Sequence, residues 1–367
     1  MTSIKKISYI QLAVLLSASR LFSEAVNFPL SNSEYGMQRF AVIFTACAIL
    51  FVQYIPLMYL AKKYPGESAV SIVINRCRPL GWIYGILISV SVLISAVSAL
   101  CRHRFYASST IFEQAPPVLM IVLLLLACGF ALWKGIQGTA RSGIIFAGIF
   151  VAFLILMTVS VWGLLEPKWL YPALIEDNKK FIKEVLEQIG SNSEIMFFAV
   201  LAEHVEEKAH RAIMWYLPVM TVILELMFLL EMLVLGPFLG SANFPFYTVS
   251  SLSNIVLFQR LDGIDVAVWT LMCIVKIALA LLCIRTVFDR LAGKKAGMII
   301  SLSGLVIVGV LAAAYGGSTA FVKTVTRILT IGIPMITTGI LFPIITIILA
   351  KKIKKKGGEN GEKKQKS

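Results

Sequence analysis

The chain has 367 residues, of which 58% are hydrophobic and only 15% are charged, and its mean hydropathy is +0.84. Soluble domains carry about one quarter charged residues, so this composition excludes a soluble protein and indicates a chain mostly embedded in a membrane. The formal net charge of +14 lies largely in the gaps between apolar segments, so it indicates membrane orientation, and we expect no nucleic-acid partner.

Ten apolar segments are each close to the ~20 residues that a helix needs to cross a bilayer. We expect them to be transmembrane α-helices, because backbone hydrogen bonds in lipid must close within each segment and the alternating pattern of a β-barrel is missing. The predicted fold class is therefore an all-α integral membrane protein. The ten segments are 8–30, 39–61, 80–101, 116–133, 142–164, 189–205, 212–236, 262–284, 297–315 and 328–350.

The distribution of Lys and Arg predicts the orientation, because loops rich in these residues stay on the cytoplasmic side. With the N-terminus inside, the cytoplasmic segments hold 22 of these residues and the opposite face holds 10. We therefore expect a multi-pass membrane protein with both termini in the cytoplasm. The basic tail, 351–367, is suited to contact anionic lipid headgroups.

Two longer loops that mix apolar and polar residues, 62–79 and 240–261, each follow the second segment of one half of the chain. In the predicted topology they lie on opposite faces, as an inverted repeat of five helices plus five would place them. This predicts a single domain over 1–350, with repeats of about 8–164 and 189–350. The alternative is that both loops are ordinary interfacial amphipathic segments.

The first apolar segment is interrupted by a polar stretch, Ser17 to Glu24, that places Arg20 and Glu24 one helical turn apart. Charged side chains within a membrane usually face a cavity or a partner. Arg20 is therefore a candidate partner for a ligand carboxylate. Two alternatives remain open: Arg20 and Glu24 pair along one helix face, or Glu24 lies near the outer end.

The sixth segment is interrupted in turn, by the sequence Gly-Ser-Asn-Ser-Glu at 190–194. Gly, Ser and Asn favour a broken or capped backbone. Polar breaks at matching places in two halves are typical of a transporter binding site between broken first and sixth helices. The alternative is that Asn192 or Ser193 only caps a helix that begins at the outer surface.

Three further charged residues lie within apolar segments and are candidates for coupling or gating, together with Glu24: Glu225, Glu231 and Lys276. Lys276 is the deepest of them. A buried lysine amine can occupy the place of a coupling sodium ion or carry a proton. Alternatively, Lys276 reaches the cytoplasmic surface or pairs with one of the two glutamates as a structural contact.

Other motifs give little support to an enzyme, a cofactor or a metal centre. The segment 203–211 can place Glu203, Glu207 and His210 on one helix face, but it lacks the His-Glu-x-x-His order, so a solvated helix end is the favoured interpretation. The six cysteines have no paired spacing, which argues against disulfides and zinc. No phosphate-binding loop or nucleophile elbow is present.

The segment from Phe244 to Lys276 resembles the B-subunit permeases of bacterial endospore germinant receptors, which belong to the amino acid/polyamine/organocation transporter superfamily. The resemblance rests on Phe244-Pro245-Phe246-Tyr247, Phe258-Gln259-Arg260-Leu261-Asp262, Trp269 and Lys276. Supporting residues are Ile7-Ser8-Tyr9-Ile10-Gln11, Pro29, Tyr64-Pro65-Gly66 and Ser193-Glu194.

This resemblance implies a LeuT-like transporter fold of ten helices in the spore inner membrane. Such a subunit binds a small nutrient, typically an amino acid, and triggers germination together with an A subunit and a C-subunit lipoprotein. The family's ligands lie between the first, third, sixth and eighth helices. By this analogy the candidate ligand-binding residues are Ser19, Arg20, Ser23, Ser95, Ser98, Asn192, Ser193, Glu194 and Trp269.

One departure from the family concerns Phe22-Ser23-Glu24, where the family usually has a Gly followed by Ser or Thr. Without Gly, an unwound backbone is less favourable, and a carboxylate at position 24 disfavours a ligand carboxylate nearby. Two other functions therefore remain open for the same fold. One is a proton- or sodium-coupled amino acid or polyamine permease, and the other is an ion-release channel subunit.

Overall fold

The computed structural model describes residues 6–26, 38–111, 116–170, 178–253 and 261–350. These segments form helices joined by turns, and their one β contact is an isolated bridge between Ile7 and Val205. The predicted all-α class is confirmed. The basic tail 351–367, Pro29 and the segment Phe258-Gln259-Arg260 lie outside the described residues.

Seven helical segments in the described part of the chain are long and apolar enough to cross a membrane. Their outward faces carry large aliphatic and aromatic side chains, as a lipid-facing surface requires. The ten-helix count and the five-plus-five repeat stay predictions. The seven segments are α2 (Gln38–Lys63), α4 (Arg78–Ser108), α5 (Pro117–Ser160), α8 (His210–Leu235, continued by a 3₁₀ turn, Gly236–Ser241), α10 (Asp262–Leu291), α11 (Lys294–Tyr315) and 319–350. The last contains α12 (Thr319–Thr330), α13 (Ile333–Ile336) and a π-helical turn, Thr337–Leu341.

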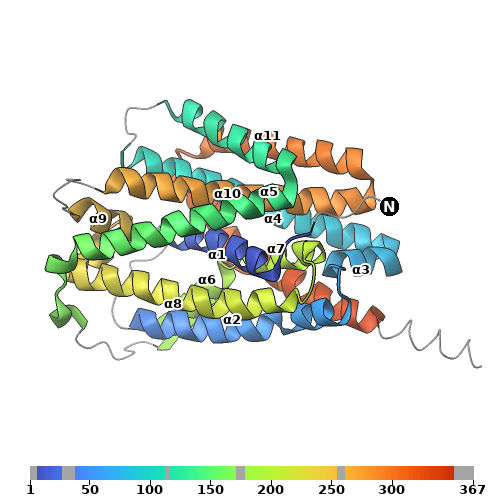
Figure 1. Cartoon of the computed structure of the whole chain (residues 1–367), viewed down its shortest axis with the longest axis horizontal. Helices are drawn as coiled ribbons and strands as arrows, with labels where there is room; N and C mark the ends of the chain where they lie inside the picture. Colours follow the sequence, from blue (N-terminus) through green and yellow to red (C-terminus); the bar gives the residue numbers. More distant parts are fainter. Residues whose placement is uncertain (1–5, 27–37, 112–115, 171–177, 254–260, 351–367) are drawn as a thin grey trace, which may run out of the picture.

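Helix α5 bends sharply at Gly135, so its two legs run back from the bend in roughly opposite directions (Figure 1). Gly135 has φ 73° and ψ −170°, a backbone conformation that residues with a Cβ rarely adopt. The two legs correspond to the predicted segments 116–133 and 142–164.

Helix α1 (Tyr9–Ala25) is continuous through the polar stretch at 17–24, so the predicted break of the first helix is wrong for these residues. The polar side chains of this stretch form ion pairs and hydrogen bonds while the helix stays intact. Arg20 pairs with Glu24 across one turn at 2.6 Å, and the Ser23 hydroxyl donates to the Ser19 carbonyl at 3.3 Å. Phe22, which stands where a helix-breaking Gly was expected, is fully buried.

The break in the sixth segment is confirmed, because α6 (Asn178–Gly190) ends three residues before α7 (Glu194–Leu201) begins. Ser193 occupies the N-cap position of α7 but its side chain makes no capping hydrogen bond. The simple N-cap interpretation of this stretch is therefore wrong. After α7 the chain makes one 3₁₀ turn, Ala202–His204, and reaches the bridge with Ile7.

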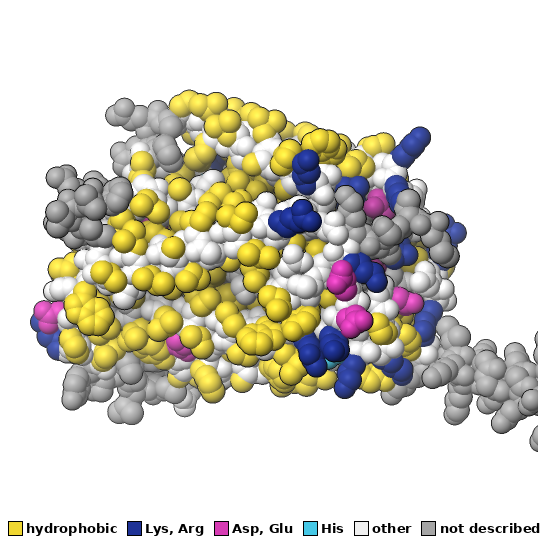
Figure 2. All heavy atoms as spheres, in the orientation of Figure 1, with side chains coloured by type: hydrophobic (Ala, Val, Ile, Leu, Met, Phe, Trp, Pro, Cys, Tyr) yellow, Lys and Arg dark blue, Asp and Glu magenta, His cyan; other side chains and the backbone are white. Residues whose placement is uncertain are grey.

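The two amphipathic loop helices, α3 (Ala69–Arg76) and α9 (Pro245–Leu252), lie at opposite ends of the bundle, as predicted (Figure 1). Lys and Arg side chains gather at the end that holds α3 and the start of the described chain, while hydrophobic side chains cover most of the rest of the visible face (Figure 2). This distribution agrees with the predicted charge asymmetry along the bundle axis.

Helix α10 lies at the centre of the bundle and packs against α1, α4, α5 and α11 (Figure 1). It is the most enclosed of the seven segments: 78% of its most apolar stretch is buried, compared with 22% for α5. A charged residue in the middle of this helix is therefore remote from both water and lipid. That is the position of Lys276.

Candidate functional site

Lys276 on α10 reaches into the space between α1 and the break that separates α6 from α7. Its amine lies 3.0 Å from Oε1 of Glu194 and donates hydrogen bonds to the hydroxyls of Ser23 at 2.7 Å and Ser193 at 2.8 Å. It also lies 3.4 Å from the Ser19 hydroxyl. Lys276 is 3% exposed, so it neither reaches the cytoplasmic surface nor pairs with Glu225 or Glu231, the two alternatives that its sequence position left open.

Glu194 is the first residue of α7 and is fully buried. The Ser19 hydroxyl donates to the same oxygen, Oε1, at 2.6 Å, and the Ser193 hydroxyl lies 3.3 Å from it. Buried charges are tolerated when they are both paired and hydrogen-bonded. Oε1 of Glu194 meets both conditions, whereas Oε2 is buried without a hydrogen-bond partner among the described residues. Glu194 and Lys276 therefore hold α1, α7 and α10 together at one point.

A cleft opens beside this pair, with about 300 Å³ of space between its walls, including the part open to solvent. Its lining comes from α1, α4, the α6–α7 break, α10 and α12. The first four of these are the helices between which the family resemblance places the ligand. The lining residues are Ser23, Ser95, Ser98, Ala99, Arg102, Ser191, Ser193, Lys276, Thr326 and Leu329.

Helix α4 contributes one polar stripe to this cleft, because Ser95, Ser98 and Arg102 recur at helical spacing on a single face. Arg102 donates to the backbone carbonyl of Ser23 at 2.9 Å, which ties α4 to α1. The Ser95 hydroxyl is buried in the wall and has no hydrogen-bond partner among the described residues. A bound molecule could satisfy it.

Arg20 points away from this cleft. It pairs with Glu24 at 2.6 Å, donates to the Ser191 hydroxyl at 2.8 Å, and donates to the Gln188 carbonyl at 3.1 Å. The Arg20–Glu24 pair along one helix face, left open by the sequence, is therefore present. Glu24 is also 3.8 Å from Arg39 of α2, and Arg39 donates to the side chain of Gln188 at 2.9 Å.

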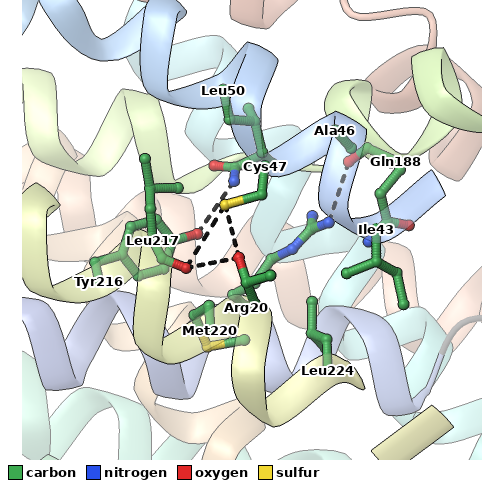
Figure 3. Close-up of a pocket in the computed structure, with 12 residues that line it drawn as sticks. Arg20, Ile43, Ala46, Cys47, Leu50, Gln188, Tyr216, Leu217, Met220 and Leu224 are labelled. Atoms are coloured by element: carbon green, nitrogen blue, oxygen red, sulfur yellow. Dashed lines mark hydrogen bonds between the residues drawn. The ribbon is translucent and has the colours of Figure 1, made fainter. Parts of the chain in front are cut away.

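A second cavity lies between α2 and α8, with about 310 Å³ of space between its walls, including the part open to solvent (Figure 3). Asn192, one of its lining residues, links both helices: it accepts a hydrogen bond from Tyr54 and donates one to Tyr216, each at 3.1 Å. Thus Ser191 and Ser193 face the first cleft, whereas Asn192 faces the second cavity. The second cavity is lined by Arg20, Ile43, Ala46, Cys47, Leu50, Gln188, Asn192, Tyr216, Leu217, Met220, Thr221 and Leu224.

Of the candidate residues, Ser19, Ser23, Ser95, Ser98, Ser193, Glu194 and Lys276 are brought together at or beside the first cleft. Trp269 does not line it. Its indole N–H donates to Asp265 at 2.9 Å, and its ring packs against Phe150 and Phe246. Glu225 and Glu231 lie on α8 and line neither cavity.

Sequence reasoning missed five residues of the first cleft: Ala99, Arg102, Ser191, Thr326 and Leu329. Arg102 was assigned to the outer loop, although its spacing from Ser95 and Ser98 marks the same helix face. Thr326 precedes the predicted start of the last segment at 328, because α12 begins earlier, at Thr319.

The possible metal cluster at 203–211 is absent: among the described residues no three His, Cys, Asp or Glu side chains are placed to hold a metal ion. Glu203 is buried and not solvated as expected. It accepts a hydrogen bond from Ser68 at 2.8 Å and lies 3.4 Å from Arg290. The contact joins the end of α7 to α3 and α10.

The family model that matches this sequence is that of the spore germination proteins known as Spore_permease, and the match covers residues 6–315. The chain belongs to this family. The match includes α1, α4, the α6–α7 break and α10, and so nearly all of the first cleft. No curated protein is significantly similar to this spore germination protein over its sequence.

Solved structures of transporters share the fold of this spore germination protein. A Na⁺-coupled sialic acid symporter, in a substrate-bound outward-open state, is similar with a TM-score of 0.64 and 12% sequence identity, covering 89% of this chain and 78% of the symporter. A manganese transporter from Eremococcus coleocola is similar with a TM-score of 0.52 and 13% identity, covering 95% and 81%. At such low identity the likeness establishes a transporter fold and no substrate.

Proposed function

We propose that this spore germination protein is a transporter-like B subunit of a nutrient germinant receptor, and that it binds a small carboxylate-bearing nutrient in the cleft beside Lys276. Amino acids, which the family resemblance implies, are one class that carries such a group. The observation that supports this proposal is the buried Lys276–Glu194 pair next to an open polar cleft.

The proposed trigger is competition for Lys276. A ligand carboxylate in the cleft lies within the reach of Lys276 and Arg102, and it draws the amine away from Glu194. Since the Lys276–Glu194 pair joins α10 to α7 and α1, weakening it favours a different packing of these helices. Partner subunits that contact the bundle respond to the new arrangement.

We further propose that the chain has ten membrane helices in two inverted repeats and lies in the spore inner membrane with both termini in the cytoplasm. The gathering of Lys and Arg at one end of the bundle supports this orientation (Figure 2). The partners we propose are an A subunit and a C-subunit lipoprotein, as the resemblance implies.

A second function is favoured by a specific observation, the fold shared with a Na⁺-coupled symporter. On this alternative the protein is a proton- or sodium-coupled permease for amino acids or polyamines. The two functions differ in what crosses the membrane, because a receptor needs ligand binding without net uptake.

The test is germination of spores that lack this gene, measured as loss of refractility across a panel of amino acids, hydroxy acids and sugars. The proposal predicts a defect restricted to particular nutrients, restored by the wild-type gene. Normal germination with every nutrient, together with lost uptake in growing cells, would instead favour the permease.

A further inference from the structure

We infer that the cleft beside Lys276 selects a small 2-hydroxycarboxylate over the amino acid of the same shape. The inference rests on the proposed function and adds to it the class of ligand. It is carried by the chemistry of the ten lining residues.

The charges of the lining favour an anion. Two of the ten lining residues, Lys276 and Arg102, are cations, and none is Asp or Glu. The nearest carboxylate in contact with the lining is that of Glu194, which Lys276 already neutralises at 3.0 Å. In a buried site two cations attract a carboxylate strongly and repel an ammonium group strongly, since the effective dielectric constant is low.

Most acceptors near the cleft that an ammonium group would need are already occupied, and the Glu194 oxygen that has no partner among the described residues, Oε2, belongs to a side chain that does not line the cleft. Oε1 of Glu194 accepts from both Lys276 and Ser19. The Ser23 carbonyl accepts from Arg102, and the Ser19 carbonyl accepts from the Ser23 hydroxyl. Because α1 is continuous, its carbonyls also bond along the helix and do not turn towards the cleft.

Hydroxyl groups make up most of the remaining lining. Ser23, Ser95, Ser98, Ser191, Ser193 and Thr326 each carry one. A hydroxyl both donates and accepts, so this wall suits a neutral hydroxyl on the ligand. The buried Ser95 hydroxyl has no partner among the described residues. The apolar lining is small, Ala99 and Leu329, which limits the ligand to a short aliphatic part.

Lactate and alanine form the matched pair that tests this inference, because they differ only in a hydroxyl against an ammonium group. Binding of racemic sodium lactate, racemic alanine and sodium propionate is measured by calorimetry on the full-length protein in lipid nanodiscs. We expect lactate to bind more tightly than alanine by about tenfold or more, and propionate, which lacks the hydroxyl, to bind more weakly than lactate.

Variants of the lining residues then test which side chains cause the preference for lactate. Arg102→Gln should weaken lactate binding by about tenfold, and Ser95→Ala should bring lactate close to propionate. Arg102→Lys, which keeps the charge, should retain the preference for lactate, and Ser109→Ala, which changes an exposed serine of the same helix region, should bind like the wild type.

Three results would overturn the inference. Alanine binding as tightly as lactate would show that the cleft accepts an ammonium group. Binding of an uncharged sugar alone, lost on Arg102→Gln or Ser95→Ala, would leave the proposed receptor function in place but refute the ligand class. If no compound of the germination panel binds and spores lacking the gene germinate normally, the proposed function fails as well.

Discussion

The Lys276 amine lies 3.0 Å from the Glu194 carboxylate, although the two residues are far apart in the chain and each sits on a different helix. Both are buried, and serine hydroxyls from α1 and the α6–α7 break make further hydrogen bonds to them. The pair therefore joins three elements at the edge of an open cleft. Disrupting the pair should therefore lower the stability of the fold and change the response of the protein to its ligand.

Lys276→Met should destabilise the protein by roughly 3–5 kcal/mol, because it leaves the Glu194 charge buried without a partner. The double variant Lys276→Met, Glu194→Gln should recover much of this loss. Thermal unfolding of each purified variant in detergent measures the loss and the recovery. Lys295→Met, at an exposed lysine, is the control and should unfold like the wild type. If the double variant unfolds at no higher temperature than Lys276→Met alone, the pair is not the source of the destabilisation.

Asn192 should be sensitive to an apolar replacement of similar size. Asn192→Leu removes the two hydrogen bonds that join Tyr54 of α2 to Tyr216 of α8 and deprives two buried hydroxyls of their amide partner, which costs about 2 kcal/mol. Changing both tyrosines to Phe in the same chain should restore part of the unfolding temperature. Tyr315→Phe, at an exposed ring, serves as control. No recovery in the triple variant would contradict this account.

Glu203 should control the stability of α3. Glu203→Ala removes the acceptor of Ser68, the N-cap residue of α3, and the partner of Arg290. We expect amide hydrogen exchange in α3 to become about tenfold faster, since losing a buried hydrogen bond costs about 1–2 kcal/mol. Glu207→Ala, at an exposed neighbour, should leave the exchange unchanged. Equal rates in the two variants would refute the role of Glu203.

Gly135→Ala tests the fold-back of α5. An added Cβ at Gly135 meets no atom within 4 Å, but φ is +73°, so the substitution should destabilise the protein by about 1 kcal/mol or more through backbone strain alone. Gly148→Ala, in the second leg, also has open space but no positive φ and should be neutral or stabilising. Equal unfolding temperatures for both variants would contradict the conformation at Gly135.

Much of the fold could be predicted because lipid imposes simple rules. Long apolar runs with few charges become helices, and two amphipathic loops lie at opposite ends, as the Lys and Arg pattern indicated. The sequence gives no comparable rule for a polar stretch inside a span. At 190–194 the polar residues interrupt the helix, whereas at 17–24 their side chains bond to each other and the helix continues.

The candidate site was predicted in part for the same reason. Ser23, Ser193, Glu194 and Lys276 belong together because buried charges need partners, although the choice of Glu194 over Glu225 or Glu231 depends on helix packing that the sequence does not display. Arg20 lines the second cavity and not the first cleft, and it pairs with Glu24 one turn away on the same helix. Arg102 was missed because α4 extends to Ser108, beyond the predicted end of the third segment.

The central claim is that a nutrient acts through the cleft beside Lys276, and the most direct test is germination of spores whose only copy of this gene carries Ser98→Leu. This variant places a larger side chain in the cleft from the α4 wall and leaves both residues of the Lys276–Glu194 pair unchanged. At wild-type protein levels, we predict loss of the same nutrient responses that the gene deletion abolishes, while Ser109→Ala germinates normally. An unchanged dose response of the Ser98→Leu spores to those nutrients would contradict the claim.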